Sequence, residues 1–211
     1  ELSAKELEKG KLIDMLLASA YVPVFRRKKL DGKDYVDGSV QNIVPIDSLL
    51  KRGYRDIIMI RIYGVGFEKK IQIPEDANVI TIAPKEKLGG ILQFDAESTK
   101  RDMMLGYFDG MRMLYGLAGE KYYIDRQWSE MQAYFVLKSM IERFVGEALP
   151  LREINEKLLP RFARKMKVKE GDYHEMLLRF LEKNAEQAGI FPFQIRTEAE
   201  LLQEIIEYRK I

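Results

Sequence analysis

Two short runs of apolar, largely β-branched residues constrain the fold of this chain more than any other feature. Asp56–Ile62 and Val79–Ala83 each have the length of a strand, and the first run follows an expected short helix, Ile46–Arg52. Continuous apolar runs that follow short helices are typical of parallel strands buried on both faces. We therefore predict an α/β fold for this part of the chain.

Apolar residues at helical spacing predict most of the remaining elements. We expect a helix within 11–20, a second over Met103–Leu117, and only helices after Asp125. Pro160 is expected to begin one of these helices. The apolar stripes are Leu12, Ile13, Leu16, Leu17 and Ala20; Met104, Tyr107, Phe108, Met111, Leu114 and Tyr115; Trp128, Met131, Phe135, Ile141, Phe144 and Val145; Tyr173, Met176, Leu177, Phe180, Leu181 and Ala188. The pattern divides the chain into an α/β region, 1–124, and a helical module, 125–211.

Local signals mark several turns and helix ends. The dipeptide Asp31-Gly32 is typical of a two-residue hairpin turn. Gly53 is placed to end the helix Ile46–Arg52. Thr197 and Glu200 have the spacing of a capping box ahead of a last helix. Each of these signals predicts a boundary from a few neighbouring residues.

Composition excludes several classes of function. Thirty-five Lys and Arg against thirty-three Asp and Glu give a net charge of +2, so no overall field points to nucleic acid. The absence of cysteine excludes a disulfide, a thiolate metal site and a Cys nucleophile within these 211 residues. It fits a reducing compartment, and we expect a cytoplasmic location. No apolar run approaches the ~18–20 residues of a membrane span, and no cluster has metal-ligand spacing, so we predict no metal and no cofactor.

Asp37 is the candidate catalytic residue. It is expected at the end of a short strand, just before Gly38, where a half-buried base could be held beside a cleft. The other interpretation is that Asp37-Gly38 is only a turn dipeptide. Spacing alone does not decide between these two interpretations.

The surrounding residues resemble the patatin-like phospholipase family. Members carry a helix ending in Ala-Ser, then a Pro and a Phe, a hairpin, Asp-Gly-Gly or Asp-Gly-Ala, and an Asn and a Pro before the next helix and strand. The corresponding residues here are Ala18, Ser19, Pro23, Phe25, Asp31, Gly32, Asp37, Gly38, Asn42 and Pro45. Ser39 departs from the family, which has Gly or Ala there. The resemblance covers about residues 10–124, and it implies part of a three-layer α/β/α sheet followed by the helical module.

The resemblance also implies a reaction. Patatin-like enzymes hydrolyse lipid acyl esters with a Ser-Asp dyad, in which the aspartate, matched here by Asp37, takes the serine proton directly. A Gly-x-Ser-x-Gly turn carries the nucleophile, and a Gly-rich loop donates N–H groups to the oxyanion. No histidine is needed, and we expect His174 to be a helix-surface or packing residue.

The nucleophile is absent from this chain. No Gly-x-Ser-x-Gly occurs in the 211 residues, and neither Gly64-Val65-Gly66 nor Gly89-Gly90 has the pattern of an oxyanion loop. In the family, the nucleophile segment precedes the aspartate. The resemblance therefore implies that this chain is a carboxy-terminal half, inactive alone and completed by an amino-terminal segment or companion chain.

Two further features each leave two interpretations open. The run Arg26-Arg27-Lys28-Lys29 suits a peripheral contact with anionic lipid, or it is a solvated loop. The methionines at 103, 104, 111 and 113 suit an acyl pocket, or they are ordinary core residues.

The sequence thus gives two main hypotheses. The first is a serine acyl hydrolase for lipids or other hydrophobic esters, with Asp37 as its general base. The second is a non-catalytic fragment or partner-binding protein with a degenerate hydrolase half, whose helical module binds the partner. A third, weaker idea is that the helical module regulates or oligomerises the same enzyme.

Overall fold

The chain has a mixed α/β fold and divides into two compact units, Glu1–Thr81 and Ile82–Ile211. The structure is a computed structural model that describes residues 5, 7, 8, 10–21, 29–40, 42–63, 68, 70, 72–90, 93 and 95–209. Within this part of the chain, no helix has the length and apolar character needed to cross a membrane. The prediction that part of a hydrolase domain ends at Ile124 and that a helical module begins at Asp125 stays a prediction.

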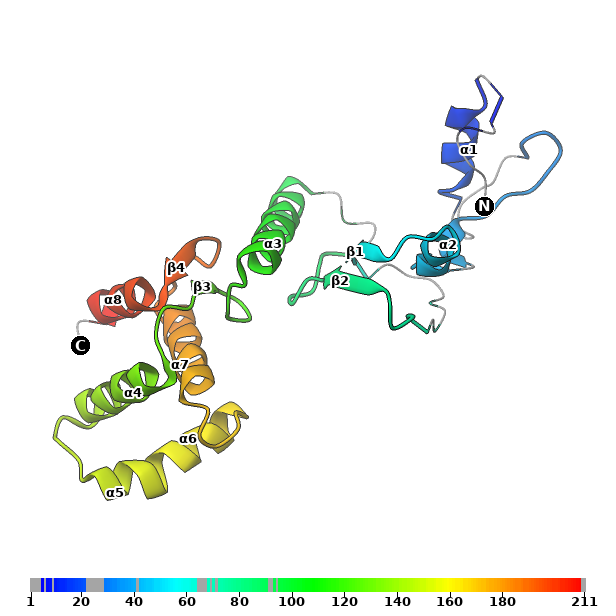
Figure 1. The fold of residues 1–211 in the computed structure, drawn as a ribbon. Coiled ribbons are helices and arrows are strands. Elements are labelled where there is room, and N and C mark those ends of the chain that lie inside the picture. The colour runs from blue at the N-terminus through cyan, green and yellow to red at the C-terminus, as the bar shows by residue number, and fades with distance from the viewer. Residues whose placement is uncertain are drawn as a thin grey trace. The chain divides into compact units, whose positions relative to one another are not determined.

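The first unit contains short helices and a two-stranded sheet (Figure 1). The strands β1 and β2 pair with each other, and β2 ends one residue into the second unit. The elements are α1 (Leu12–Ala18), the 3-10 helix η2 (Gly38–Val40), α2 (Ile46–Lys51), β1 (Asp56–Ile60) and β2 (Asn78–Ile82).

The local signals in this unit predict the observed turns. Asp31 and Gly32 both have positive φ, 50° and 72°, and the flanking Leu30 and Lys33 exchange two backbone hydrogen bonds. Two positive φ values in a two-residue loop are those of a type I′ hairpin turn. Gly53, with φ 89°, follows α2 as predicted.

The prediction that the strands are buried on both faces is wrong. In β1 only Ile57 is buried, whereas Ile58 and Ile60 are 62% and 72% exposed. All five residues of the apolar stripe predicted within 11–20 are also exposed, and the buried residue of α1 is Ala18, which lies outside that stripe. The physical reason is that two paired strands with short helices supply too little surface to cover these side chains within the part of the chain that is described.

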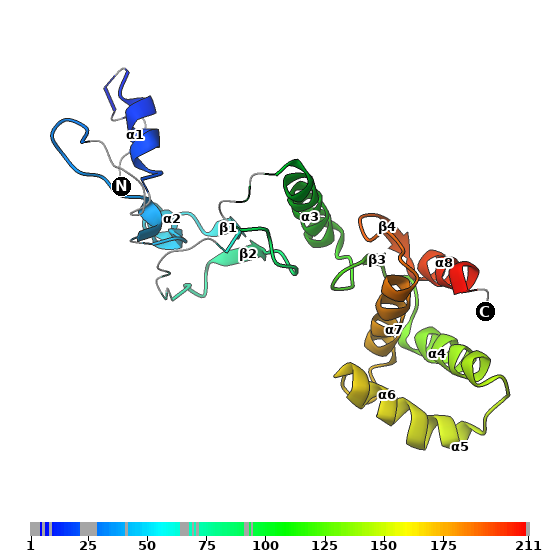
Figure 2. The same ribbon diagram turned by 180° about the vertical axis from the view of Figure 1, so that it is seen from behind.

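The second unit is mainly helical, and a small parallel sheet joins distant parts of its sequence (Figure 1, Figure 2). The elements are α3 (Ala96–Tyr115), β3 (Tyr123–Asp125), α4 (Glu130–Val145), α5 (Leu151–Glu153), the π-helix η3 (Ile154–Leu158), α6 (Leu159–Met166), α7 (Tyr173–Gln187), β4 (Ile195–Thr197) and α8 (Glu198–Arg209).

The prediction of no strand after Asp125 is therefore wrong. Strand β4 pairs in parallel with β3, and Ile124 lies opposite Arg196. Three residues are too few to show a two-residue alternation, and this strand exists because a distant segment pairs with it.

The core of the second unit lies between β3, α4, α7 and α8. Its fully buried side chains include Ile124, Leu137, Met176, Leu177, Leu181, Leu201 and Ile205. The stripe predicted on α7 is confirmed by the burial of Met176, Leu177 and Leu181. Removing seven such side chains from water is the main stabilising contribution to this unit, because each gains roughly 1.5–3 kcal/mol.

The buried face of α4 differs from the predicted one. Met131, Phe135 and Val145 are more than half exposed, whereas Ala133, Leu137 and Met140 are buried. Both sets have helical spacing, so periodicity alone does not choose between them. The small side chain of Ala133 allows the close packing of α4 on α7 that larger residues would prevent.

Candidate functional site

Asp37 lies in a tight turn that its own carboxylate holds. The backbone N–H of Ser39 donates to Oδ1 of Asp37 at 2.7 Å, and the carbonyl of Asp37 accepts from Val40 N–H at 3.1 Å. The N–H of Asp37 donates to the carbonyl of Tyr21 at 3.0 Å. The side chain of Asp37 is half-buried. These hydrogen bonds thus fix Asp37 relative to the backbone of Ser39 and Val40 and to that of Tyr21.

The strand predicted to end at Asp37 is not observed. The bridge between Leu30 and Lys33 does not extend into residues 34–37, where only Asp37 N–H bonds to a distant carbonyl, that of Tyr21, among the described residues. Gly38 has no positive φ, and a Cβ added there would meet no atom within 4 Å. The conformation therefore does not require glycine at this position, which leaves open space beside the carboxylate.

Asn42 connects the Asp37 turn to α2. Its N–H donates to the carbonyl of Gly38 at 2.9 Å, and its Oδ1 accepts from Val44 N–H at 3.2 Å. Its Nδ2 donates to Oδ1 of Asp47 in the first turn of α2 at 3.3 Å. Pro45 stands just before that helix. These contacts explain why an Asn and a Pro follow the aspartate, and sequence reasoning missed the Asp47 partner.

Several residues of the resemblance lie outside the described residues. These are Pro23 and Phe25, the run Arg26–Lys28, and Gly64-Val65-Gly66. The two interpretations of the basic run stay open. Of the remaining residues, Ala18 is buried, and Ser19 Oγ donates to the carbonyl of Leu16 at 2.8 Å at the end of α1.

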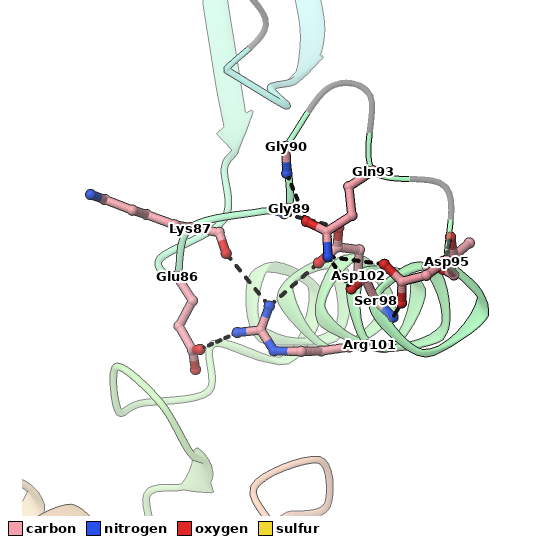
Figure 3. Close-up of polar contacts among 10 residues, drawn as sticks. Glu86, Lys87, Gly89, Gly90, Gln93, Asp95, Ser98, Arg101 and Asp102 are labelled. Atoms are coloured by element: carbon pink, nitrogen blue, oxygen red, sulfur yellow. Dashed lines mark hydrogen bonds and ion pairs between the residues drawn. The ribbon is translucent and has the colours of Figure 1, made fainter.

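Gly89 and Gly90 belong to a loop that folds onto the first turns of α3. Figure 3 shows Gly89 N–H donating to Asp102 and Gly90 N–H donating to Gln93, both at 3.2 Å. Asp95 caps the helix by accepting from Ser98 N–H at 2.8 Å, and this bond, with those from the Gln93 and Ser98 side chains, lowers the pKa of Asp95 to about 2. The backbone N–H groups of Gly89 and Gly90 are thus engaged by side chains of the chain itself.

The methionines of α3 lie at the surface or only partly buried. Met103 is 71% exposed and, with Met104 and Tyr107, lines an open depression of about 590 Å³. Met111 and Met113 do not line it. The depression is apolar, but it is formed by one helix face and encloses no ligand-sized cavity. The acyl-pocket interpretation stays a prediction.

A buried ion pair within α3 lies on the face of the helix that contacts β3. Asp109, which is 5% exposed, pairs with Arg112, whose guanidinium lies 4.1 Å above the ring of Tyr123. Burial raises the pKa of Asp109, against the opposing charge of Arg112. Arg112 also donates to the carbonyls of Glu120 and Tyr122 at 3.1 Å and 3.2 Å. This pair joins α3 to the turn before β3.

A second buried carboxylate organises the same turn. Oε1 of Glu182 on α7 accepts three successive backbone N–H groups, from Glu120, Lys121 and Tyr122, at 2.6, 2.8 and 2.9 Å. Three donors satisfy a buried negative charge that would otherwise be costly. Its role is structural, because the charge is fully engaged by the backbone.

His174 is a packing residue, as predicted. Its Nε2 contacts Oε1 of Glu198, a fully buried carboxylate at the start of α8. The other oxygen of Glu198 accepts from Gln127 and Trp128 N–H at 3.1 and 2.9 Å. The pair therefore joins α7, α8 and the segment before α4. Sequence reasoning missed Glu182 and Glu198, because the backbone N–H groups that donate to them lie 60 to 71 residues away.

Comparison with known proteins gives no relative: no family model, no curated protein and no solved structure matches the chain. Within the described residues, no group of three or more Asp, Glu and His side chains could hold a metal ion. The case for a function therefore depends on the residues around Asp37 and on their chemistry.

Proposed function

We propose that this chain supplies the catalytic aspartate of a patatin-like lipid acyl hydrolase. The observation that carries the proposal is the turn at Asp37. In this turn the Ser39 N–H donates to one carboxylate oxygen at 2.7 Å, and a Cβ added at the neighbouring Gly38 would meet no atom within 4 Å. A base needs a fixed position and space for the group that it deprotonates. The order of Asp37, Gly38, Asn42 and Pro45 in the patatin-like motif supports the same assignment.

In the proposed reaction, Asp37 first accepts a proton as a general base and then returns it as a general acid. A serine Oγ attacks the carbonyl carbon of the ester, and its proton passes to Oδ2 of Asp37. The tetrahedral intermediate collapses, and Asp37 returns the proton to the departing alcohol oxygen. Water then attacks the acyl-serine by the same route and releases the fatty acid. The substrate class is a lipid or another hydrophobic ester.

In this proposal the nucleophile and the oxyanion donors come from a polypeptide segment outside these 211 residues. Exposed apolar side chains among the described residues of the first unit support such a partner, because exposed apolar patches mark interaction sites. At least half of each side chain is exposed for Ile13, Leu16, Leu17, Ile58, Ile60 and Ile62. The Asp37 turn lies in the same unit.

One observation favours a second function, the binding of a protein partner without catalysis. The second unit has its own apolar core, capped helices and internally paired buried carboxylates. It therefore has the features of a module that folds on its own. If Asp37 is only a turn residue, this module is the working part of the chain.

Intact-mass spectrometry with a fluorophosphonate serine probe tests the proposal on the native protein that carries this sequence. We expect one probe adduct, on a serine outside the present 211 residues. A native protein that takes up no probe would overturn the hydrolase proposal and leave the partner-binding function. Asp37→Asn is the matched variant, because it should abolish labelling while the protein still folds.

A further inference from the structure

The positive charge of this chain is concentrated in one segment. Residues 157–169 contain six basic side chains and no Asp or Glu: Lys157, Arg161, Arg164, Lys165, Lys167 and Lys169. Thirty-five basic residues less these six leave twenty-nine, against thirty-three acidic residues in the rest of the chain. The small net charge of +2 therefore hides a strongly basic segment on an otherwise acidic protein.

The helix geometry gathers this charge on one side. The elements α5, η3 and α6 follow one another without a break from Leu151 to Met166 (Figure 1). The wider turn of the π-helix η3 places Ile154 and Leu159, five residues apart, on the buried side. Ala163 is buried on the same side, and Phe162 packs near Phe180 at 6.2 Å.

The opposite side of this helix is basic and exposed. Lys157, Arg161, Arg164 and Lys165 recur at intervals of three and four residues, which puts them on one face. Lys167 ends α6 in a left-handed conformation, φ 58°, and Lys169 follows in the next turn. All six side chains are exposed. We call these six residues the basic face.

The basic face is not neutralised by its surroundings. Within the described residues, none of its six side chains forms an ion pair, although the start of the same continuous helix and the helix α4 both carry such pairs. Arg152 pairs with Glu156 at 2.9 Å, and Lys138 pairs with Glu142 at 2.8 Å. An exposed cluster of like charges whose members are not ion-paired attracts an anionic partner.

We propose that the basic face binds the surface of an anionic membrane. Clustered lysines and arginines on an amphipathic helix are attracted to acidic lipid headgroups, and each contributes about fivefold to the binding constant. Single-stranded nucleic acid fits less well, because it needs exposed aromatic side chains for stacking, and Phe162, the only aromatic residue of the segment, packs inward. The choice of lipid over other polyanions rests in part on the proposed hydrolase function.

Vesicle cosedimentation of the full 211-residue chain tests this proposal. The vesicles are made of ether-linked phosphatidylcholine, with or without ether-linked phosphatidylglycerol. Ether lipids carry no acyl ester, so binding is measured whether or not the hydrolase proposal holds. We expect binding only when phosphatidylglycerol is present, and weaker binding as salt is added.

The paired variants are Arg161→Gln with Lys165→Gln, and the control Lys100→Gln with Lys183→Gln. Each pair removes two exposed charges, but only the first pair lies on the basic face. The first pair should weaken binding by about twentyfold or more, and the control pair should leave it unchanged. Thermal melting checks that both variants are folded.

Three results would overturn the proposal. They are equal binding to vesicles with and without phosphatidylglycerol, equal loss in the two double variants, and tighter binding to a duplex DNA of equal charge concentration than to the acidic vesicles. The last result would assign the basic face to nucleic acid.

Discussion

The backbone N–H of Ser39 donates a 2.7 Å hydrogen bond to Oδ1 of Asp37. This bond closes a turn two residues long and orients the carboxylate without help from any side chain. Because the donor is a backbone group, the hydroxyl of Ser39 is not needed for it. Under the proposed function, this accounts for serine at the position where the patatin-like motif has glycine or alanine.

Substitutions at Ser39 separate the backbone donor from the side chain. Ser39→Ala keeps the N–H and should leave ester hydrolysis near the wild-type rate. Ser39→Pro removes the N–H and should lower kcat/KM roughly tenfold or more, because a hydrogen bond to a charged group is lost. Both rates are measured on the native protein that carries the nucleophile. Equal rates for the two variants would show that this bond does not position Asp37.

Gly119 and Gly146 form a matched pair for stability. Both have positive φ, 90° and 83°, but a Cβ at Gly119 would lie 2.5 Å from the carbonyl oxygen of Tyr122, whereas one at Gly146 would meet nothing within 4 Å. Gly146→Ala should cost about 1 kcal/mol through backbone strain alone. Gly119→Ala should cost clearly more, because it also displaces the turn bound by Glu182. Urea unfolding measures both; equal losses would contradict the crowding at Gly119.

The lowered pKa of Asp95 should make the stability of the folded chain depend on pH. Hydrogen bonds from Ser98 and Gln93 lower the pKa of Asp95 to about 2, below its ordinary value of 3.8. The folded chain therefore holds the ionised form more readily than the unfolded chain, and the resulting stability is full above about pH 5 and is lost as the pH falls toward 2.

Asp95→Asn is the comparison, since asparagine still caps the helix but does not titrate. The melting temperature of the wild type should exceed that of Asp95→Asn at neutral pH, and the difference should shrink as the pH is lowered through about 4 toward 3. A difference that stays constant over this range would contradict the role of the ionised carboxylate.

Sequence predicted the features that a few neighbouring residues determine. The Asp31-Gly32 turn depends on two residues that tolerate positive φ, and the capping box depends on Thr197 and Glu200, which exchange hydrogen bonds at 2.7 and 3.2 Å. The turn at Asp37 is equally local. Its position in the sequence was therefore predictable, although the strand that was predicted before it is not observed.

Features that depend on distant partners could not be predicted in this way. Strand β4 needs β3 to pair with it, and the buried face of α4 is chosen by α7. In the sequence, Glu182 and Glu198 resemble ordinary surface residues of a helix. Only the fold brings the backbone N–H groups that donate to their carboxylates close to them. Tertiary contacts override the local pattern in each case.

The most direct test of the account is the rate of ester hydrolysis by Asp37→Asn compared with Asp34→Asn in the native protein. Asp34 lies three residues away, is exposed, and pairs only loosely with Lys29 at 3.7 Å. We predict that Asp37→Asn lowers kcat/KM by about a hundredfold to ten-thousandfold, the usual contribution of a general base, and that Asp34→Asn keeps the wild-type rate. A folded Asp37→Asn protein with near wild-type kcat/KM would contradict the assignment of Asp37 as the base.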